Sequence, residues 1–475
     1  MTVPSVVPLA HLNGKVEKHA NGTTNGNGSH EPLHILTGSE ALRRIREGSL
    51  TVEAYARALL NRIQAHDATV KAWAYLDPAY VLAQARALDS VPAKERGPLH
   101  GLPIGVKDAI YTKDMPTEHN SEIYKGSFPQ VDSASIMILR NAGALIFGRV
   151  VLKGKTVTTE FAAITIGPKT TNPHSPHEIR SPGGSSSGSA AGVADGQIPV
   201  ALATQTGGST IRPASYNGIY CIKPTWNAVS REGQKLYSLL LDTLGWYGRS
   251  VSDLVLLADI FSLEDDEPST FNGVRGAKFA VCKTNNWHKA SEATRQALVK
   301  AAALLKAHGA IVEDLELPSS FESLTDWYLT VLETDGATTF LPEHRVARNK
   351  LHESLAVFID KPAYTRKQTL AAQDGIAALR PEFDAIASQY DAVLTPSAVD
   401  EAPYGLEYTG DAVFCADWTA LHVPVVNIPG FKGPSGMPVG VSLVAPRFRD
   451  RHLLKVAEDV GKIFESEGGW RSSIL

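Results

Sequence analysis

The sequence contains little cysteine and no long apolar run. Its three cysteines, Cys221, Cys282 and Cys415, lie far apart in 475 residues and form no CxxC pair. They are too few for a disulfide framework, and their spacing does not suit a metal site. No apolar run reaches the roughly 18 residues of a membrane span, and the first residues lack the basic start of a secretory signal. We therefore expect a cytoplasmic protein.

The sequence also lacks a large excess of charge of either sign. Its formal net charge is −4, and no basic run is present. Binding to nucleic acid or to a membrane surface therefore has no electrostatic support, and we expect neither partner. The apolar fraction of 43% is sufficient for a large hydrophobic core.

Residues 1–33 differ in composition from the rest of the chain. They include a polar run, rich in glycine and asparagine, at residues 19–30. Such a segment cannot bury enough apolar surface to fold, so we predict that residues 1–33 are disordered. No break in composition divides residues 34–475, which we expect to form a single domain.

Strand-like and helix-like patterns alternate beyond residue 34, which is typical of an α/β fold with a sheet covered by helices on both faces. Thr37 or Ser39 can begin the first helix, Gly48 can end it, and Thr51 can begin the second. Further helices are expected at residues 134–141, 292–308, 377–389 and 450–464, and strands at 104–106, 144–148, 278–282, 310–315, 392–395, 423–428 and 439–444. Residues 315–370 have the weakest periodicity and are expected to form a lid or substrate-facing loops.

The most informative stretch is residues 181–225. Glycine or serine occupies eight of the nine positions from Ser181 to Ser189. This composition alone is typical of a flexible linker. Here, however, a helical run at residues 190–194 and an apolar, strand-like run at residues 199–203 follow. We therefore interpret the stretch as a backbone that glycine shapes so that a substrate can approach closely.

One candidate nucleophile in this stretch is Ser186. Residues 184–188 match the G-x-S-x-G nucleophile elbow of α/β-hydrolases, which needs a strand immediately before it. Pro173, Pro176 and Pro182 precede the motif and disfavour a central strand there. An esterase of the α/β-hydrolase type with Ser186 as nucleophile is therefore the alternative hypothesis.

The other candidate nucleophile is Ser209, which follows Gly207 and Gly208. A serine hydroxyl needs a base, and Lys107 can serve if burial keeps its amine neutral. A serine from the cluster 185–187 can then relay the proton between them. The chemistry of the residues alone leaves both nucleophiles open.

Several segments in fixed order decide between these hypotheses. They read GLPIGVKD at 101–108, GKTVTTEFA at 154–162, SPGGSSSGSAA at 181–191, TQTGGSTIRPAS at 204–215, CIKPT at 221–225 and LDTLGWYGRSVSDL at 241–254, followed by PVVNIPG and GMPVGVSLV. On these segments the chain resembles the amidase signature family from residue 34 onward. The resemblance implies a large mixed, twisted β-sheet covered by helices, and hydrolysis of carboxamide C–N bonds through a Ser–cis-Ser–Lys triad.

The resemblance also assigns roles to individual residues. It implies that Lys107 is the base, that Ser185 is the cis-serine relay, and that Ser209 is the nucleophile. The oxyanion hole falls on the backbone amides of Thr206, Gly207, Gly208 and Ser209, and no metal or organic cofactor is implied. The expected substrate is a small-molecule amide. The expected protein partner is a second copy of the chain, in a homodimer.

Two positions depart from the pattern of many family members. Gln205 stands where many have aspartate, and Arg212 comes third after the nucleophile rather than second. We associate this pattern with stand-alone amidases rather than with a glutamine amidotransferase subunit. Thr156, Ser187 and Arg212 are expected to support the loops. A non-catalytic, amidase-like scaffold subunit is the remaining alternative.

Overall fold

The computed structural model describes residues 32–151, 169–175 and 177–474. Residues 1–31 of the segment predicted to be disordered, and Thr156, therefore lie outside the described residues. Leu33 begins a short 3-10 helix, Leu33–Ile35, and its side chain packs against the core. Because Leu33–Leu475 forms one compact unit, we propose that residues 34–475 fold as a single domain and that Leu33 belongs to it.

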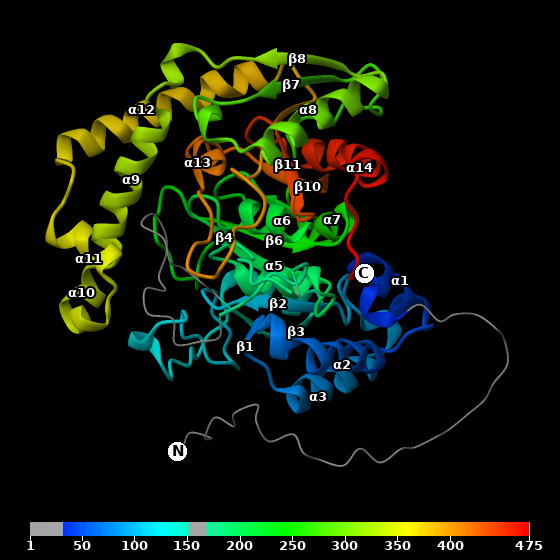
Figure 1. The fold of residues 1–475 in the computed structure, drawn as a ribbon. Coiled ribbons are helices and arrows are strands. Elements are labelled where there is room, and N and C mark those ends of the chain that lie inside the picture. Colours follow the sequence, from blue (N-terminus) through cyan, green and yellow to red (C-terminus); the bar gives the residue numbers. More distant parts are fainter. Residues whose placement is uncertain (1–31, 152–168, 176, 475) are drawn as a thin grey trace. The chain divides into compact units, whose positions relative to one another are not determined.

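The centre of this unit is a mixed sheet, in which the described residues form eleven strands in the order β1-β3-β2-β4-β6-β5-β10-β11-β9-β7-β8 (Figure 1). β2 is parallel to β3 and β4, and β7 is parallel to β8 and β9, whereas the remaining pairs are antiparallel. The predicted α/β fold with a large mixed sheet is confirmed. The strands are β1 Trp73–Tyr75, β2 Pro103–Lys107, β3 Leu145–Val150, β4 Val200–Gln205, β5 Tyr220–Lys223, β6 Thr243–Gly248, β7 Lys278–Cys282, β8 Ile311–Leu315, β9 Ala392–Pro396, β10 Val425–Lys432 and β11 Pro438–Val444.

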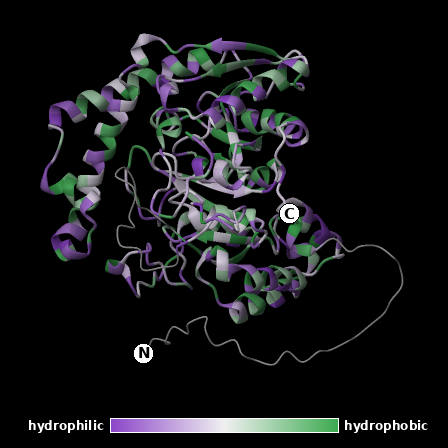
Figure 2. Ribbon diagram, viewed as in Figure 1, coloured by the Kyte–Doolittle hydropathy of each residue, from purple (hydrophilic) through white to green (hydrophobic). Residues whose placement is uncertain are grey.

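Helices cover both faces of the sheet, and two hydrophobic cores lie beneath them. In β4, Ala201 and Ala203 belong to one core, whereas Val200 and Leu202 belong to the other. Successive side chains of a strand point to opposite faces, so the two cores lie on opposite sides of the sheet. In Figure 2 the outer helices carry hydrophilic and hydrophobic residues in alternation, as expected for helices with one buried face. The helices are α1 Gly38–Glu47, α2 Val52–Val70, α3 Pro78–Asp89, α4 Ala134–Asn141, α5 Ser187–Ala194, α6 Ile211–Asn217, α7 Val251–Ile260, α8 Glu292–Ala307, α9 Leu324–Thr339, α10 Leu341–Ala347, α11 Glu353–Asp360, α12 Arg366–Ala387, α13 Val413–Ala420 and α14 Asp450–Glu467.

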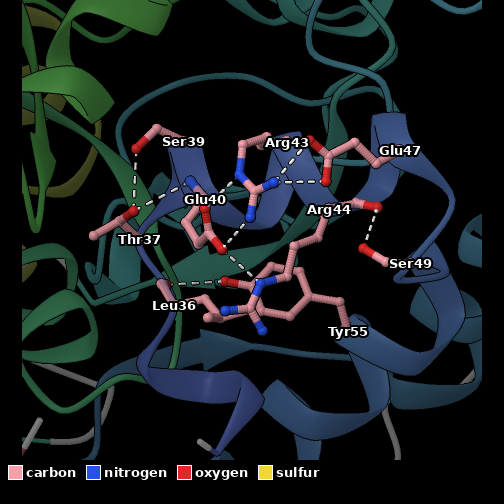
Figure 3. A network of polar contacts seen from close by, with 9 residues as sticks. All are labelled: Leu36, Thr37, Ser39, Glu40, Arg43, Arg44, Glu47, Ser49 and Tyr55. Carbon is pink, nitrogen blue, oxygen red and sulfur yellow. Dashed lines mark hydrogen bonds and ion pairs between the residues drawn. The ribbon is translucent and has the colours of Figure 1, made fainter.

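The ends of the first helices follow local sequence signals. The Thr37 side chain accepts a hydrogen bond from the Glu40 N–H at 3.2 Å and begins α1, and Gly48 ends it with φ 76°. On the exposed face of α1, Arg43 forms ion pairs with Glu40 and Glu47 (Figure 3). Such exposed pairs stabilise a helix by only about 0.3–0.5 kcal/mol each. The cap and the buried face therefore define this helix more strongly than its surface charges.

The expectation of substrate-facing loops at residues 315–370 is wrong, because this segment is mainly helical, whereas a lid at this place stays a prediction. It contains α9, α10 and α11 and the start of α12. In α9, Leu324, Tyr328, Val331 and Leu332 are buried at helical spacing. Threonines, which favour helices weakly, surround these residues in the sequence and obscured their periodicity. The predicted helix at 377–389 likewise begins earlier, at Arg366, where Thr365 and Gln368 form a capping box.

No helix in the part of the chain that the structure describes is long and apolar enough to cross a membrane.

Candidate active site

Lys107 is the last residue of β2 and is completely buried. Ile104 and Val106 point into one core, so alternation directs Lys107 to the opposite face of the sheet. Its Nζ lies 2.6 Å from Ser185 Oγ, 2.7 Å from Thr204 Oγ1 and 3.3 Å from the Thr204 carbonyl oxygen. The structure thus brings the predicted lysine together with the first of the two predicted serines, and the burial that a lysine base needs is present.

Ser185 lies on a buried loop immediately before α5. The peptide bond between Gly184 and Ser185 is cis. The Arg212 guanidinium donates to the Gly184 carbonyl at 2.6 Å, and Ser187 Oγ donates to the Gly183 carbonyl at 2.7 Å. Ser187 and Arg212 therefore support this loop, as expected, by holding two of its successive carbonyls.

Ser209 lies in the segment that joins β4 to α6, and it is completely buried. Because β2 and β4 are parallel neighbours, the segment that follows β4 begins at the same edge of the sheet where Lys107 ends β2. The Tyr247 hydroxyl, which comes from β6, lies 3.0 Å from the Thr210 carbonyl oxygen and 3.3 Å from the Ser209 carbonyl oxygen. The topology therefore places Lys107 and both serine-bearing loops at one edge of the sheet.

The backbone N–H groups of Gly207 and Gly208 are two buried hydrogen-bond donors in this segment. Within the described residues, neither N–H donates to an acceptor, although buried N–H groups are nearly always paired. A Cβ at Gly207 would lie 2.5 Å from the Tyr328 hydroxyl, and a Cβ at Gly208 would lie 3.1 Å from the Cβ of Ala412. The two glycines therefore allow close packing on one side, and their amides can receive an oxyanion.

Asp242 holds the beginning of the same segment, although sequence reasoning assigned it no role. Its carboxylate accepts hydrogen bonds at 2.6 Å from Thr206 Oγ1 and from the Tyr237 N–H. Burial raises the pKa of Asp242 to about 6. The only sequence signal was its position at the start of the LDTLGWYGRSVSDL segment. Asp242 therefore fixes the Thr206 side chain from the turn that precedes β6.

Ser186, the alternative nucleophile, lies at the start of α5, where its Oγ is 3.4 Å from the Thr204 carbonyl. No strand precedes it within residues 169–175 and 177–185, where Arg180 and Ser185 are assigned isolated bridges, that of Arg180 with Tyr404. The strand that a nucleophile elbow requires is therefore missing from that described segment.

Burial shifts the pKa values of other titratable groups near these loops. Burial lowers the pKa of His174 to about 4, and its Nε2 lies 2.9 Å from the Asn217 carbonyl oxygen. Burial also raises the pKa of Cys415 to about 12, so its thiol stays protonated. Among the described residues, no group of three His, Cys, Asp or Glu side chains could hold a metal ion.

Comparison with known proteins gives consistent results over almost the whole chain. A family model described as Amidase matches residues 54–454. A glutamyl-tRNA(Gln) amidotransferase subunit from Chloroflexus aurantiacus is 29% identical, over 91% of this chain and 97% of the relative. A crystal structure of an amidase superposes with a TM-score of 0.76 at 29% identity, over 92% of this chain and 99% of that one. The native peptide amidase from Stenotrophomonas maltophilia gives a TM-score of 0.77 at 25% identity, over 93% and 99%.

Proposed function

The chain belongs to the amidase family, whose members act on C–N bonds, and we propose that it hydrolyses a carboxamide bond of a small molecule through an acyl-enzyme on Ser209. The observation that carries this proposal is the 2.6 Å contact between the buried Nζ of Lys107 and Ser185 Oγ. A lysine amine against a serine hydroxyl, both excluded from water, is the arrangement that a lysine base requires.

A neutral lysine amine, which has two N–H groups and one lone pair, can make the contacts of Lys107 with Ser185 and Thr204. The Thr204 carbonyl oxygen can act only as a hydrogen-bond acceptor, and the Thr204 hydroxyl oxygen can act as an acceptor too, so each can take one N–H of the amine. The lone pair can then receive the hydrogen of the Ser185 hydroxyl. Complete burial favours this neutral form, because a charged ammonium loses its hydration there.

The proposed reaction follows from this arrangement. Ser185 passes the proton of Ser209 to Lys107 as Ser209 Oγ attacks the carbonyl carbon of the amide. The resulting oxyanion is stabilised by backbone N–H groups of residues 206–209, and each such donor is worth about 10²–10³ in kcat. When the C–N bond breaks, the proton returns to the leaving amine. Water then hydrolyses the acyl-enzyme, again with the serine and lysine as proton relay.

The choice of a small-molecule amide rests on charge and on the similar amidases. The chain has a net charge of −4 and no basic run, which does not favour a nucleic-acid substrate. A second candidate is a role as the amidase-like component of a complex. It is supported by the similarity to the amidotransferase subunit from Chloroflexus aurantiacus over nearly the whole length of both chains.

The purified chain alone tests both candidates. We expect it to release ammonia from at least one of propionamide, benzamide and leucinamide. We also expect a fluorophosphonate probe to label it at Ser209, whereas Ser209→Ala should lose labelling and turnover and keep its melting temperature. Absence of turnover and labelling would contradict the stand-alone amidase. Labelling without turnover would favour the role in a complex.

A further inference from the structure

We propose that Thr419 and Gln205 are positioning residues that orient the peptide between Gly207 and Gly208 and so aim the Gly208 N–H at the oxyanion. This inference deepens the proposed function and rests on it. Thr419 lies on α13, and Gln205 is the last residue of β4. Both side chains are buried beside the segment that carries Ser209.

The Gly207 carbonyl accepts a hydrogen bond from Thr419 Oγ1 at 2.8 Å. In a planar trans peptide, the carbonyl and the following N–H point in opposite directions. Holding the Gly207 carbonyl against α13 therefore turns the Gly208 N–H away from α13. That N–H is buried and, within the described residues, donates to no acceptor.

The adjacent carbonyls are also held, but in different ways. The Gly208 carbonyl accepts from the Arg212 N–H at 3.0 Å, which belongs to the first turn of α6. The Thr206 carbonyl lies 3.4 Å from the Tyr328 hydroxyl, a long contact. The bond from Thr419 is thus the shortest of the three, and it holds the central peptide.

Gln205 determines where the Thr419 hydrogen points. Its Oε1 accepts from the N–H groups of Thr210 and Ile211 at 2.9 and 3.0 Å, so its Nε2 must face Thr419 Oγ1, at 3.1 Å. Because this amide donates to the threonine oxygen, the threonine hydrogen remains for a carbonyl acceptor.

Two carbonyls compete for that hydrogen. The Cys415 carbonyl, one helical turn before Thr419, lies at 3.0 Å, and the Gly207 carbonyl lies at 2.8 Å. Bonding to the preceding turn is the usual alternative for a threonine within a helix. A carboxylate at position 205 would accept the threonine hydrogen itself and remove it from both carbonyls. The side-chain amide of Gln205 avoids this outcome.

The test compares Thr419→Val, which keeps the shape and removes the hydroxyl, with Thr419→Ser, which restores it. Thr294→Val is the matched control, because Thr294 is also a buried helical threonine and donates to a backbone carbonyl, that of Ala398, at 3.1 Å. Each variant is assayed for kcat and KM on the amide that the wild-type chain hydrolyses best, for the rate of fluorophosphonate labelling, and for melting temperature.

We expect Thr419→Val to lower kcat about 10- to 100-fold with little change in KM, since the loss of one whole donor costs about 10²–10³. Labelling, in which Ser209 displaces fluoride from phosphorus, should slow in parallel because it also places negative charge on an oxygen. Thr419→Ser should restore most of the lost kcat. Thr294→Val should change melting temperature as much as Thr419→Val does, but not kcat.

Two results would overturn the inference. One is an unchanged kcat in Thr419→Val, and the other is an equal loss of kcat in Thr419→Val and Thr294→Val, which would show a purely structural effect. Failure of the proposed function gives a different result, because the wild-type chain would then neither hydrolyse an amide nor take up the probe.

Discussion

Replacing Lys107 by methionine removes the proposed base while keeping an unbranched side chain of similar length. The contacts to Ser185 Oγ, Thr204 Oγ1 and the Thr204 carbonyl are lost. A buried polar group left unpaired costs about 1–3 kcal/mol, but methionine also removes the cost of burying an amine. We therefore expect a net change in the free energy of unfolding within about 2 kcal/mol.

The effect on activity should be much larger than the effect on stability. A positioned general base contributes about 10²–10⁴ to the rate, so Lys107→Met should lose at least two orders of magnitude in kcat/KM. Lys107→Arg should be similarly inactive, because a guanidinium stays protonated at any workable pH and cannot accept a proton. Unfolding by denaturant, followed by circular dichroism, is measured beside the amide kinetics.

The two variants separate a base from a positioning charge. If Lys107→Arg keeps substantial activity while Lys107→Met does not, the lysine acts by its positive charge, and the base lies elsewhere. In that case the proton relay through Ser185 would be refuted even if Ser209 remained the nucleophile.

Ser185→Ala should lose far more kcat than Ser187→Ala, because only Ser185 contacts the lysine amine; equal losses would reject the relay. Deletion of residues 1–31 should leave melting temperature and turnover unchanged, because their composition cannot bury enough apolar surface to fold; a fall in either would show that the segment contributes to the fold. Burial raises the pKa of Asp242 from 3.8 to about 6, so the folded state binds this proton more tightly than the unfolded state. The free energy of unfolding should therefore fall as pH rises from about 4 to 6. Asp242→Asn lacks this titration, so its free energy of unfolding, measured by urea unfolding, should increase relative to wild type by about 3 kcal/mol between pH 4 and pH 7. An unchanged difference between the two proteins would contradict the raised pKa.

Local signals in the sequence predicted the elements of the site well. The strand predicted at residues 104–106 lies within β2, which ends at Lys107. Residues 134–141 and 278–282 form the predicted helix and strand with the same bounds. Signals of this kind act over a few residues, so they can be read without knowledge of the fold.

Contacts between distant segments could not be predicted from the same patterns. Lys107 and Ser185 are 78 positions apart, and Thr419 is 212 positions from Gly207. Hydrophobic periodicity shows which face of an element is buried, but not which other element covers it. The pairing of Lys107 with Ser185 rather than Ser186 therefore came from resemblance, and the contact of α13 with the Gly207 carbonyl came only from the structure.

The Gln205 side chain meets two separate hydrogen-bonding requirements, one at the start of α6 and one on α13. From the sequence it was only a departure from a common aspartate, and it served to separate classes of amidase. In the structure its Oε1 accepts from two N–H groups at the start of α6, and its Nε2 donates to Thr419 on α13. A carboxylate could meet the first requirement but not the second, and an apolar residue could meet neither. Glutamine at this position therefore requires a hydrogen-bond acceptor on α13, and Thr419 provides one.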